Sequence, residues 1–237
     1  MGTTLNPDYH MRAYHGEKAI ISLTSWKARI GTVSKTLFSL ITMCPGFHIV
    51  LVLSEEEFPK KEAELPASLM ALVNNNLIEL LWVYKNYKSF KKVLFTMDKY
   101  RDVPVISADD DCIYTCNYAE ELYRVWVQQP NSVIACTVEN GEAWGYATLH
   151  RPHELSTEKV LPLLNMMIAE NISDDDFLFS CWNRISQVPI IGLGLHPSQV
   201  CIFHDSIMPL GNERHRFNPK YKQVIEKYLT LMYSQKI

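Results

Sequence analysis

Residues 103–114 read VPVISADDDCIY, and the rest of the chain is interpreted outward from this stretch. The apolar run 103–106 is typical of a strand buried on both faces of a sheet. Asp109, Asp110 and Asp111 follow it, and neighbouring carboxylates stay ionised together when a cation lies among them. Oxygen ligands at the end of a buried strand suit Mg²⁺ or Mn²⁺, whereas the alternative is a solvated acidic turn. Because side chains alternate along an extended chain, we expect Asp109 and Asp111 to face one way and Asp110 the other.

The first 114 residues alternate short apolar runs with helical stretches. This alternation predicts an α/β fold with a parallel sheet and right-handed crossovers. In such sheets, ligands bind at the carboxyl ends of the strands. Strands are expected at 19–24, 49–53, 77–83 and 103–106, with helices at 32–43, 59–75 (interrupted at Pro66) and 88–100 between them.

The remainder is less regular. Residues 139–155 are rich in Gly, aromatic residues, His and Arg, which favours a substrate-facing loop over a core element. No linker or repeat divides the chain, so a single domain is expected. Further elements are predicted as helices at 117–129 and 156–170, a strand at 132–137, a short helix after Asp174–Asp176, and apolar pieces at 188–193 and 200–203. From residue 218 an amphipathic helix is expected, whose apolar face would hold Tyr221, Val224, Ile225, Tyr228, Leu229 and Met232.

Composition limits the classes of function. The chain has 237 residues, of which 47% are hydrophobic and 21% charged, as expected for a soluble globular protein. Its net charge of −3 argues against a nucleic-acid binder, which is usually basic. The six cysteines include no CxxC pair, which favours free thiols in a reducing cytosol over a zinc site. The first twenty residues have no apolar core and no run is long enough to span a membrane, so we expect a cytoplasmic protein.

Polar and basic side chains follow other predicted strands. Thr24, Ser25 and Arg29 come after the first strand and suit a nucleotide's base and phosphates, although an ordinary polar loop would look the same. Segment 84–92 interleaves four lysines with three aromatic residues, which suits base stacking and a diphosphate, or a solvated helix face. There is no GxGxxG or GxxxxGK[ST] motif, which removes the main support for dinucleotide and P-loop sites. His204 follows the run 200–203 and is either a packed residue or a metal ligand.

The stretches ISLTSWKARI, KNYKSFKK, SADDDCIY and SDDDFLF together resemble the GT-A glycosyltransferases, over about residues 18–205. The resemblance implies one Rossmann-like α/β domain with a mostly parallel sheet flanked by helices. Its parts would be a nucleotide-sugar-binding half at 18–138, an acceptor-facing half at 139–217 and a C-terminal amphipathic helix at 218–237.

The same resemblance assigns roles to residues of both halves. A divalent ion, Mn²⁺ or Mg²⁺, would bind the donor's diphosphate, and an acid of the later motif would deprotonate the acceptor. The implied metal ligands are Asp111, Asp109 and His204; the implied nucleotide-sugar contacts are Thr24, Ser25, Arg29, Lys92, Asp109 and Asp110; the implied base is Asp175 or Asp176.

These observations predict a metal-dependent, inverting glycosyltransferase of surface-glycan or polysaccharide assembly. The donor would be a UDP-sugar by preference, and the acceptor a glycan or lipid-linked glycan. One alternative is a phosphatase of the haloacid dehalogenase type, although its DxD normally follows the first strand. Another is a non-catalytic sugar- or cation-binding protein. We expect helix 218–237 to dock on the domain, with peripheral contact to the inner face of the membrane as the alternative.

Overall fold

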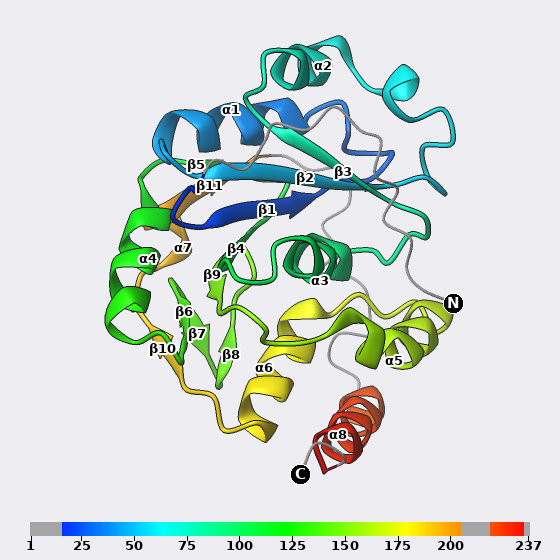
Figure 1. Ribbon diagram of the computed structural model, residues 1–237, viewed down its shortest axis with the longest axis vertical. Coiled ribbons are helices and arrows are strands. Elements are labelled where there is room, and N and C mark those ends of the chain that lie inside the picture. The colour runs from blue at the N-terminus through cyan, green and yellow to red at the C-terminus, as the bar shows by residue number, and fades with distance from the viewer. Residues whose placement is uncertain (1–15, 205–218, 235–237) are drawn as a thin grey trace.

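The strands of the computed structural model build one large sheet and two small ones, within residues 16–204 and 219–234, which the structure describes. The large sheet has the order β10-β6-β9-β4-β1-β2-β3, while β5 pairs with β11 and β7 with β8 (Figure 1). The strands are β1 (Ile20–Thr24), β2 (His48–Ser54), β3 (Glu79–Val83), β4 (Val105–Ala108), β5 (Cys112–Tyr114), β6 (Val133–Ala135), β7 (Val138–Glu139), β8 (Glu142–Ala143), β9 (Ala147–His150), β10 (Ile190–Gly192) and β11 (Cys201–Phe203).

Helices cover both faces of the large sheet, as Figure 1 shows. The interruption expected at Pro66 is confirmed, because this proline separates a short 3₁₀ helix from α2. The helices are α1 (Val33–Met43), the 3₁₀ helix η1 (Lys61–Glu64), α2 (Ala67–Asn74), α3 (Phe90–Lys99), α4 (Tyr118–Gln128), α5 (Thr157–Ala169), α6 (Asp175–Ile185), α7 (Pro197–Val200) and α8 (Pro219–Ser234).

The predicted α/β class and mostly parallel sheet are confirmed. β1 pairs in parallel with β2 and β4, β2 with β3, and β6 with β10. β9 is antiparallel to both β4 and β6. The expectation of a loop throughout 139–155 is therefore wrong, since all four residues of β9 are buried in the sheet. β9 was not recognised in the sequence because it contains polar residues. These residues can be buried because they have internal partners: Thr148 donates to the Trp144 carbonyl and His150 contacts Glu154.

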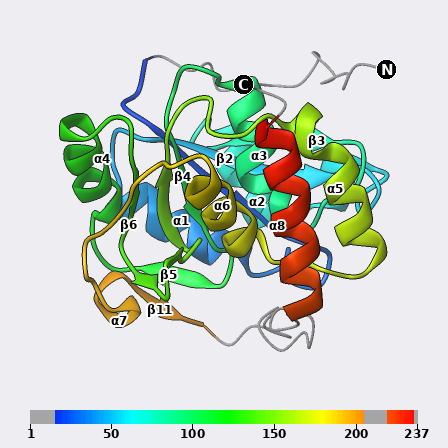
Figure 2. The same cartoon turned by 90° about the horizontal axis from the view of Figure 1, so that it is seen from below.

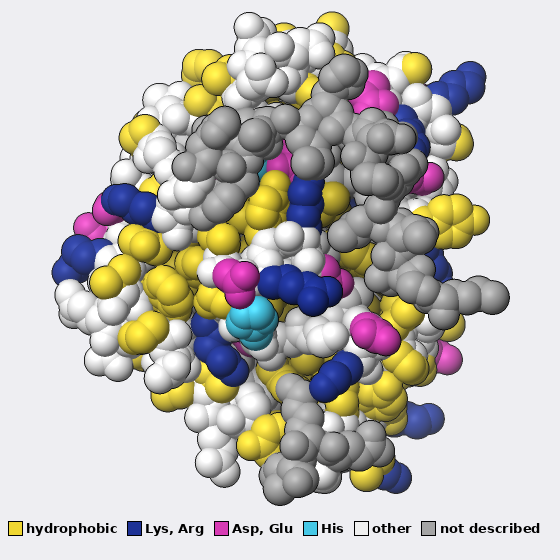
Figure 3. Space-filling view, in the orientation of Figure 1, with side chains coloured by type: hydrophobic (Ala, Val, Ile, Leu, Met, Phe, Trp, Pro, Cys, Tyr) yellow, Lys and Arg dark blue, Asp and Glu magenta, His cyan; other side chains and the backbone are white. Residues whose placement is uncertain are grey.

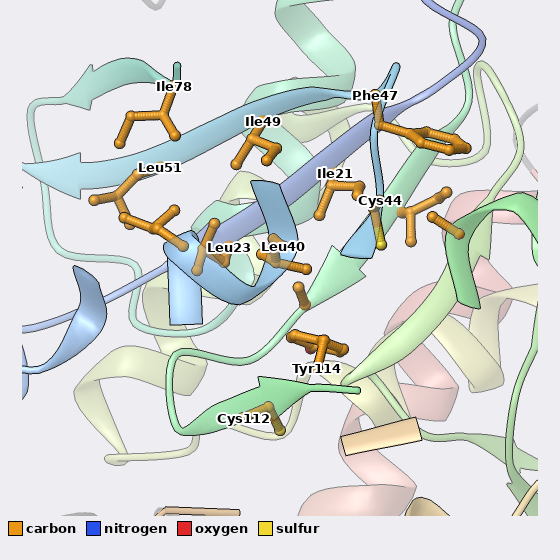
Figure 4. Close-up of a cluster of buried hydrophobic side chains, with 14 of the residues drawn as sticks. Ile21, Leu23, Leu40, Cys44, Phe47, Ile49, Leu51, Ile78, Cys112 and Tyr114 are labelled. Carbon is orange, nitrogen blue, oxygen red and sulfur yellow. The ribbon is translucent and has the colours of Figure 1, made fainter. Parts of the chain in front are cut away.

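Side-chain alternation along the strands divides the core between the two faces. Ile21 and Leu23 of β1 join a cluster with residues of α1, α2 and α4, and Figure 4 shows part of it. Ile20 points to the other face, into a cluster with residues of α3, α5, α6 and α8. The cysteines are free thiols, as expected, and all but Cys116 are buried. On the surface shown in Figure 3, acidic and basic side chains are interspersed with apolar ones.

The C-terminal helix docks on the domain, as predicted. α8 lies beside α5 and α6 (Figure 2), and its Ile225 and Leu229 are buried. Val224, which the helical pattern placed on the apolar face, is 43% exposed, because the docked face is centred on Ile225 and Leu229. No helix among the described residues is both long and apolar enough to cross a membrane. Peripheral membrane contact and the division at residue 138 stay predictions, although β9 and β10 from the second half join the same sheet.

Candidate active site

A cavity of about 860 Å³ opens where the carboxyl ends of β1 and β4 lie side by side. Its walls come from the loops after these strands, the segment before α3, the turn around Gly145, the start of α6 and one residue of α8. Nine acidic and five basic side chains line it among the described residues. All the predicted site residues except His204 are among its lining residues: Thr24, Ser25, Arg29, Lys92, Asp109, Asp110, Asp111, Asp175 and Asp176.

Asp110 and Asp111 share a partner in Arg29. The Nη1 atom of Arg29 lies 2.5 Å from Asp110 Oδ1 and 3.0 Å from Asp111 Oδ2, and Ser25 Oγ donates to Asp110 Oδ2 at 2.7 Å. The expectation that Asp110 faces away from Asp109 and Asp111 is therefore wrong, because the chain turns at Asp110 and Asp111 instead of staying extended. Asp110 is buried and joins the loop after β1 to the loop after β4, while Asp111 is the more accessible of the two.

Lys92 joins the two acidic segments. Its Nζ donates to Asp109 Oδ1 at 2.7 Å and lies 3.2 Å from Asp175 Oδ2, although the side chain is almost fully buried. Burial alone would lower the pKa of Lys92, but the charges of Asp109, Asp175 and Asp176 raise it well above its usual range. Lys92 is therefore a cation held at the meeting point of segments that are far apart in the sequence.

The three residues of the later acidic segment have different environments. Asp174 caps α6 by accepting a hydrogen bond from the Phe177 amide, at 3.1 Å. Asp175 contacts Lys92, and Asp176 Oδ1 accepts from the Gly145 amide at 3.1 Å. Helix capping thus explains Asp174. It does not explain Asp175 and Asp176, whose carboxylates line the cavity.

Gly145 is the residue that permits this approach. A Cβ atom at position 145 would lie 2.3 Å from Asp176 Oδ1 and 3.3 Å from Lys92 Nζ. At the first distance a Cβ atom would displace the Asp176 carboxylate, so glycine at position 145 permits the contact seen here. In the sequence, a glycine between Trp144 and Tyr146 was a visible signal of a close backbone approach. Nothing in the sequence indicated that Asp176 is the residue approached.

Thr24 and His204 are less clearly placed for the roles the resemblance implies. Thr24 lines the cavity, yet its hydroxyl donates to the Val52 carbonyl at 2.7 Å. His204 is beside the acidic turn, because its amide donates to the Asp111 carbonyl at 3.0 Å, and its Nε2 is 3.5 Å from Thr36 Oγ1. The roles of both residues stay predictions.

The carboxylates suit a metal ion that is shared with a substrate. Within residues 16–204 and 219–234, no three His, Cys, Asp or Glu side chains form a group that could hold a metal by themselves. Burial and the nearby charge of Asp109 raise the pKa of Asp111, while Arg29 opposes them. Mg²⁺ is commonly held by one or two carboxylates together with substrate phosphates and water, and Asp109 and Asp111 fit that arrangement.

Three further cations of the cavity wall, Lys88, Lys91 and Lys222, were not assigned a role from the sequence. Lys91 is buried with its Nζ 3.0 Å from Asn86 Oδ1, and burial lowers its pKa to about 8. Lys222 of α8 donates to Glu142 at 2.8 Å and lies 4.4 Å from the centre of the Phe177 ring. Lys91 belongs to the lysine-rich segment 84–92, which the sequence already indicated as a candidate binding segment. No sequence feature near Lys222 indicated that it would line the cavity.

The fold is that of GT-A-like nucleotide-sugar glycosyltransferases. One similar structure is the mannosyltransferase PcManGT from Pyrobaculum calidifontis in complex with GDP-Man and Mn²⁺, with a TM-score of 0.54 and 11% identity over 98% of this chain and 73% of that one. TarS 1–349 from S. aureus is similar in its complex with UDP, with a TM-score of 0.53 and 10% identity over 90% of this chain and 65% of that one. The structure of TarS 1–349 in complex with UDP-GlcNAc has a TM-score of 0.54 and 9% identity, over 90% of this chain and 66% of that one.

At 9–11% identity these similarities concern the fold. The chain spans 65–73% of the length of the three structures. No family model and no curated protein matches the sequence.

Proposed function

We propose that this protein is a glycosyltransferase that transfers a sugar from a nucleotide-sugar donor to a carbohydrate acceptor, with the help of a divalent cation. The observation that carries the proposal is the contact of Lys92 with both Asp109 and Asp175. A donor's diphosphate needs cations at its leaving group, and an acceptor hydroxyl needs a base close by. Here the two kinds of group meet in one large cavity, in a fold that nucleotide-sugar glycosyltransferases use.

The donor half of the site is built around Asp109 and Asp111. A diphosphate would be repelled by the acidic excess of the cavity wall, so Asp109 and Asp111 would hold Mn²⁺ or Mg²⁺ against it, with His204 as a candidate third ligand. The ion would supply charge neutralisation to the leaving diphosphate. Lys92 would add a fixed positive charge, while Ser25 and Arg29 orient the acidic turn through Asp110.

The acceptor half would use Asp175, with Asp176 as the second candidate, to take the proton from the attacking hydroxyl in an inverting transfer. Both carboxylates line the cavity at the first turn of α6. GDP-Man in the PcManGT structure and UDP-GlcNAc in a TarS structure make GDP- and UDP-sugars the donors to screen first. Surface-glycan or polysaccharide assembly is the pathway we propose.

The test is a thermal-shift screen of UDP, GDP and their sugars with and without Mn²⁺. A ligand that binds only the folded state at a hundred times its Kd stabilises it by about 2.7 kcal/mol. We expect the wild-type protein to gain stability from one nucleotide only when Mn²⁺ is present, and Asp111→Asn to lose that gain. Asp102→Asn is the matched control, because the Asp102 side chain is exposed and pairs with His153 outside the cavity.

Each other outcome points to a different conclusion. If Asp111→Asn gains as much Mn²⁺-dependent stability from the nucleotide as the wild type does, Asp111 is not a metal ligand. Phosphatase activity without nucleotide binding would favour the haloacid dehalogenase alternative. Nucleotide-sugar binding without hydrolysis or transfer to any acceptor would favour a binding protein.

A further inference from the structure

A second cavity, of about 10 Å³, shares Asp175, Asp176 and Gly145 with the large one. Its other walls include Val133 of β6 and His150 of β9. This volume is at the lower limit for one water molecule, which also needs polar partners. The small cavity therefore lies between the proposed base and the interior of the protein, and the polar atoms around it decide what it does.

A buried polar cluster forms the inner side of the small cavity. His150 Nδ1 lies 3.2 Å from Glu154 Oε2, and Asn183 Nδ2 donates to Glu154 Oε1 at 2.6 Å. Trp182 Nε1 donates to the Glu154 carbonyl at 2.6 Å, which fixes the backbone of the cluster. Glu154 and Asn183 are each 1% exposed, and His150 is buried. The cluster is therefore internally hydrogen-bonded and shielded from bulk solvent.

The contacts with Glu154 determine which atoms of the cluster are left for a ligand. An ionised carboxylate only accepts hydrogen bonds, so it fixes the Asn183 amide with Nδ2 toward Glu154 and keeps the proton of a neutral His150 on Nδ1. Within the described part of the chain, Asn183 Oδ1 is a buried atom with no hydrogen-bond partner. His150 contacts Glu154 through Nδ1, so Nε2 is the ring nitrogen that remains for a ligand. Both atoms belong to residues that line the small cavity. Two acceptors on a water-sized space call for a donor of two hydrogen bonds, which a water molecule is.

We infer that one water in the small cavity connects Asp175 to His150, and that the His150–Glu154 pair receives the proton that Asp175 takes from the acceptor. The inference rests on the proposed glycosyl transfer. His150 acts on the acceptor only through Asp175, so it is a positioning residue that restores the base.

The proton and electron pairs balance as follows. The acceptor's O–H bond breaks as its oxygen forms the new bond to the sugar, and the donor's sugar–oxygen bond breaks with its electron pair on the diphosphate. Asp175 holds the released proton. The water then takes this proton and gives one of its own to His150 Nε2, so Asp175 is a carboxylate again and the water is unchanged. The imidazolium keeps its Nδ1 proton toward Glu154, whose negative charge balances it. After the product leaves, the proton returns through the same water to Asp175 and passes to solvent in the large cavity, so His150 is neutral before the next turnover.

The ionisable groups that line the small cavity come from two elements, because His150 is on β9 and Asp175 and Asp176 are on α6. Glu154, on the loop after β9, contacts His150 but does not line the cavity. Lys92 of α3 pairs with Asp175 from the side of the large cavity. The charge of Asp175 should therefore favour protonation of His150, and its removal should disfavour it.

The test that needs no substrate is a ¹⁵N-histidine NMR titration of the full chain. Asp175→Asn is expected to lower the midpoint of His150 protonation, because it removes a negative charge from the same small cavity. Asp102→Asn should alter the titration of His153, its partner, and leave His150 unchanged. A His150 midpoint that ignores Asp175→Asn overturns the relay.

Kinetics separate the water from a purely electrostatic coupling. Val133→Ile adds one methylene to the small cavity and changes no polar group, so it should displace the water. With the donor found by thermal shift, Val133→Ile and His150→Gln should each lower kcat roughly tenfold with KM for the donor unchanged, and Asp102→Asn should lower neither. Melting temperatures check that each variant folds.

Unchanged kcat in both folded variants overturns the relay and leaves the proposed function standing. If the wild type turns over no nucleotide sugar, the proposed function falls, and the relay's part in transfer with it. The NMR coupling distinguishes these cases, because it reports on Asp175 and His150 without any donor.

Discussion

Lys91 and Lys92 are adjacent and both buried, yet their partners give them opposite properties. Lys92 lies among carboxylates, which hold its pKa well above the usual range in spite of burial. Lys91 has Asn86 as its hydrogen-bond partner and Glu57 at 3.7 Å, so burial dominates and lowers its pKa to about 8. Adjacent positions on α3 therefore hold one lysine whose pKa is raised by carboxylates and one whose pKa is lowered by burial.

Single substitutions in the later acidic segment test which of its members is the proposed base. Asp175→Asn should lower turnover about a hundredfold or more, with donor affinity nearly unchanged, because the residue would act on the acceptor. Asp176→Asn tests the second candidate in the same way. The measurement is kcat and KM for the donor that stabilises the wild-type protein.

Asp174→Asn is the control for these variants, since asparagine caps a helix about as well as aspartate. Its turnover should stay close to that of the wild type. Near wild-type turnover in both Asp175→Asn and Asp176→Asn would mean that the acidic run is structural, and the proposed inverting mechanism would lose its base.

At the scale of elements, α8 belongs to both the core and the cavity. Leu229 is fully buried in the cluster shared with α3, α5 and α6, and the Tyr233 ring meets Trp182 edge-on. Arg184 of α6 forms an ion pair with Glu226. Lys222, on the same helix, lines the large cavity beside Glu142. Loss of α8 would therefore remove both packing and one lining residue of the cavity.

The docking of α8 predicts a difference between two substitutions on it. Leu229→Ala should lower the free energy of unfolding by about 2–5 kcal/mol, because it leaves a cavity in the core. Val224→Ala should change it by less than about 0.5 kcal/mol, since Val224 is exposed. Urea denaturation of the two variants measures both values. Similar small losses in both would mean that α8 does not dock in solution.

At the scale of the whole molecule, the sheet carries a polar cluster at each end. The cavity lies at the carboxyl ends of β1 and β4, whereas Glu79 starts β3 at the opposite end. Glu79 is fully buried and bonds to His48 at 2.7 Å, to Lys99 at 2.6 Å and to Tyr100. Burial alone would raise the pKa of Glu79, but these hydrogen bonds lower it below its ordinary value. This cluster fastens β2, β3 and the end of α3 far from the site.

Glu79→Gln should therefore destabilise the protein in a pH-dependent way. A carboxylate with a lowered pKa stabilises the fold above its unfolded pKa, and the effect is lost as the pH falls through the folded value. We expect a loss of about 3–5 kcal/mol at pH 7, shrinking as the pH falls below about 4. Urea unfolding at pH 7, 5 and 3.5 measures the gap, which is the difference in the free energy of unfolding between the wild type and Glu79→Gln. Glu121→Gln is the control, because Glu121 is exposed. A gap that stays constant down to pH 3.5 would contradict this assignment.

The sequence by itself determined the layered α/β fold, because apolar runs, helical periodicity and Pro66 are local signals. It also determined where the first acidic segment and the basic segment would fall, since residues that follow consecutive parallel strands reach the same edge of the sheet. The later acidic segment follows helix α5, so its place in the site came only from the resemblance. It did not reveal β9, whose Thr148 and His150 do not form an apolar run. It also assigned Val224 to the buried face of α8, where periodicity alone does not fix the centre of contact.

Only the tertiary structure decided how the site residues pair. The turn at Asp110 brings Asp110 and Asp111 to Arg29. Within the two acidic segments, Asp109 and Asp175 form ion pairs with Lys92. Asp174 is separated from its neighbours by its place at the start of α6. The Glu154 cluster joins residues of β9, its loop and α6. Each of these contacts depends on the direction of a side chain in three dimensions, and sequence spacing carries that information only within a single element.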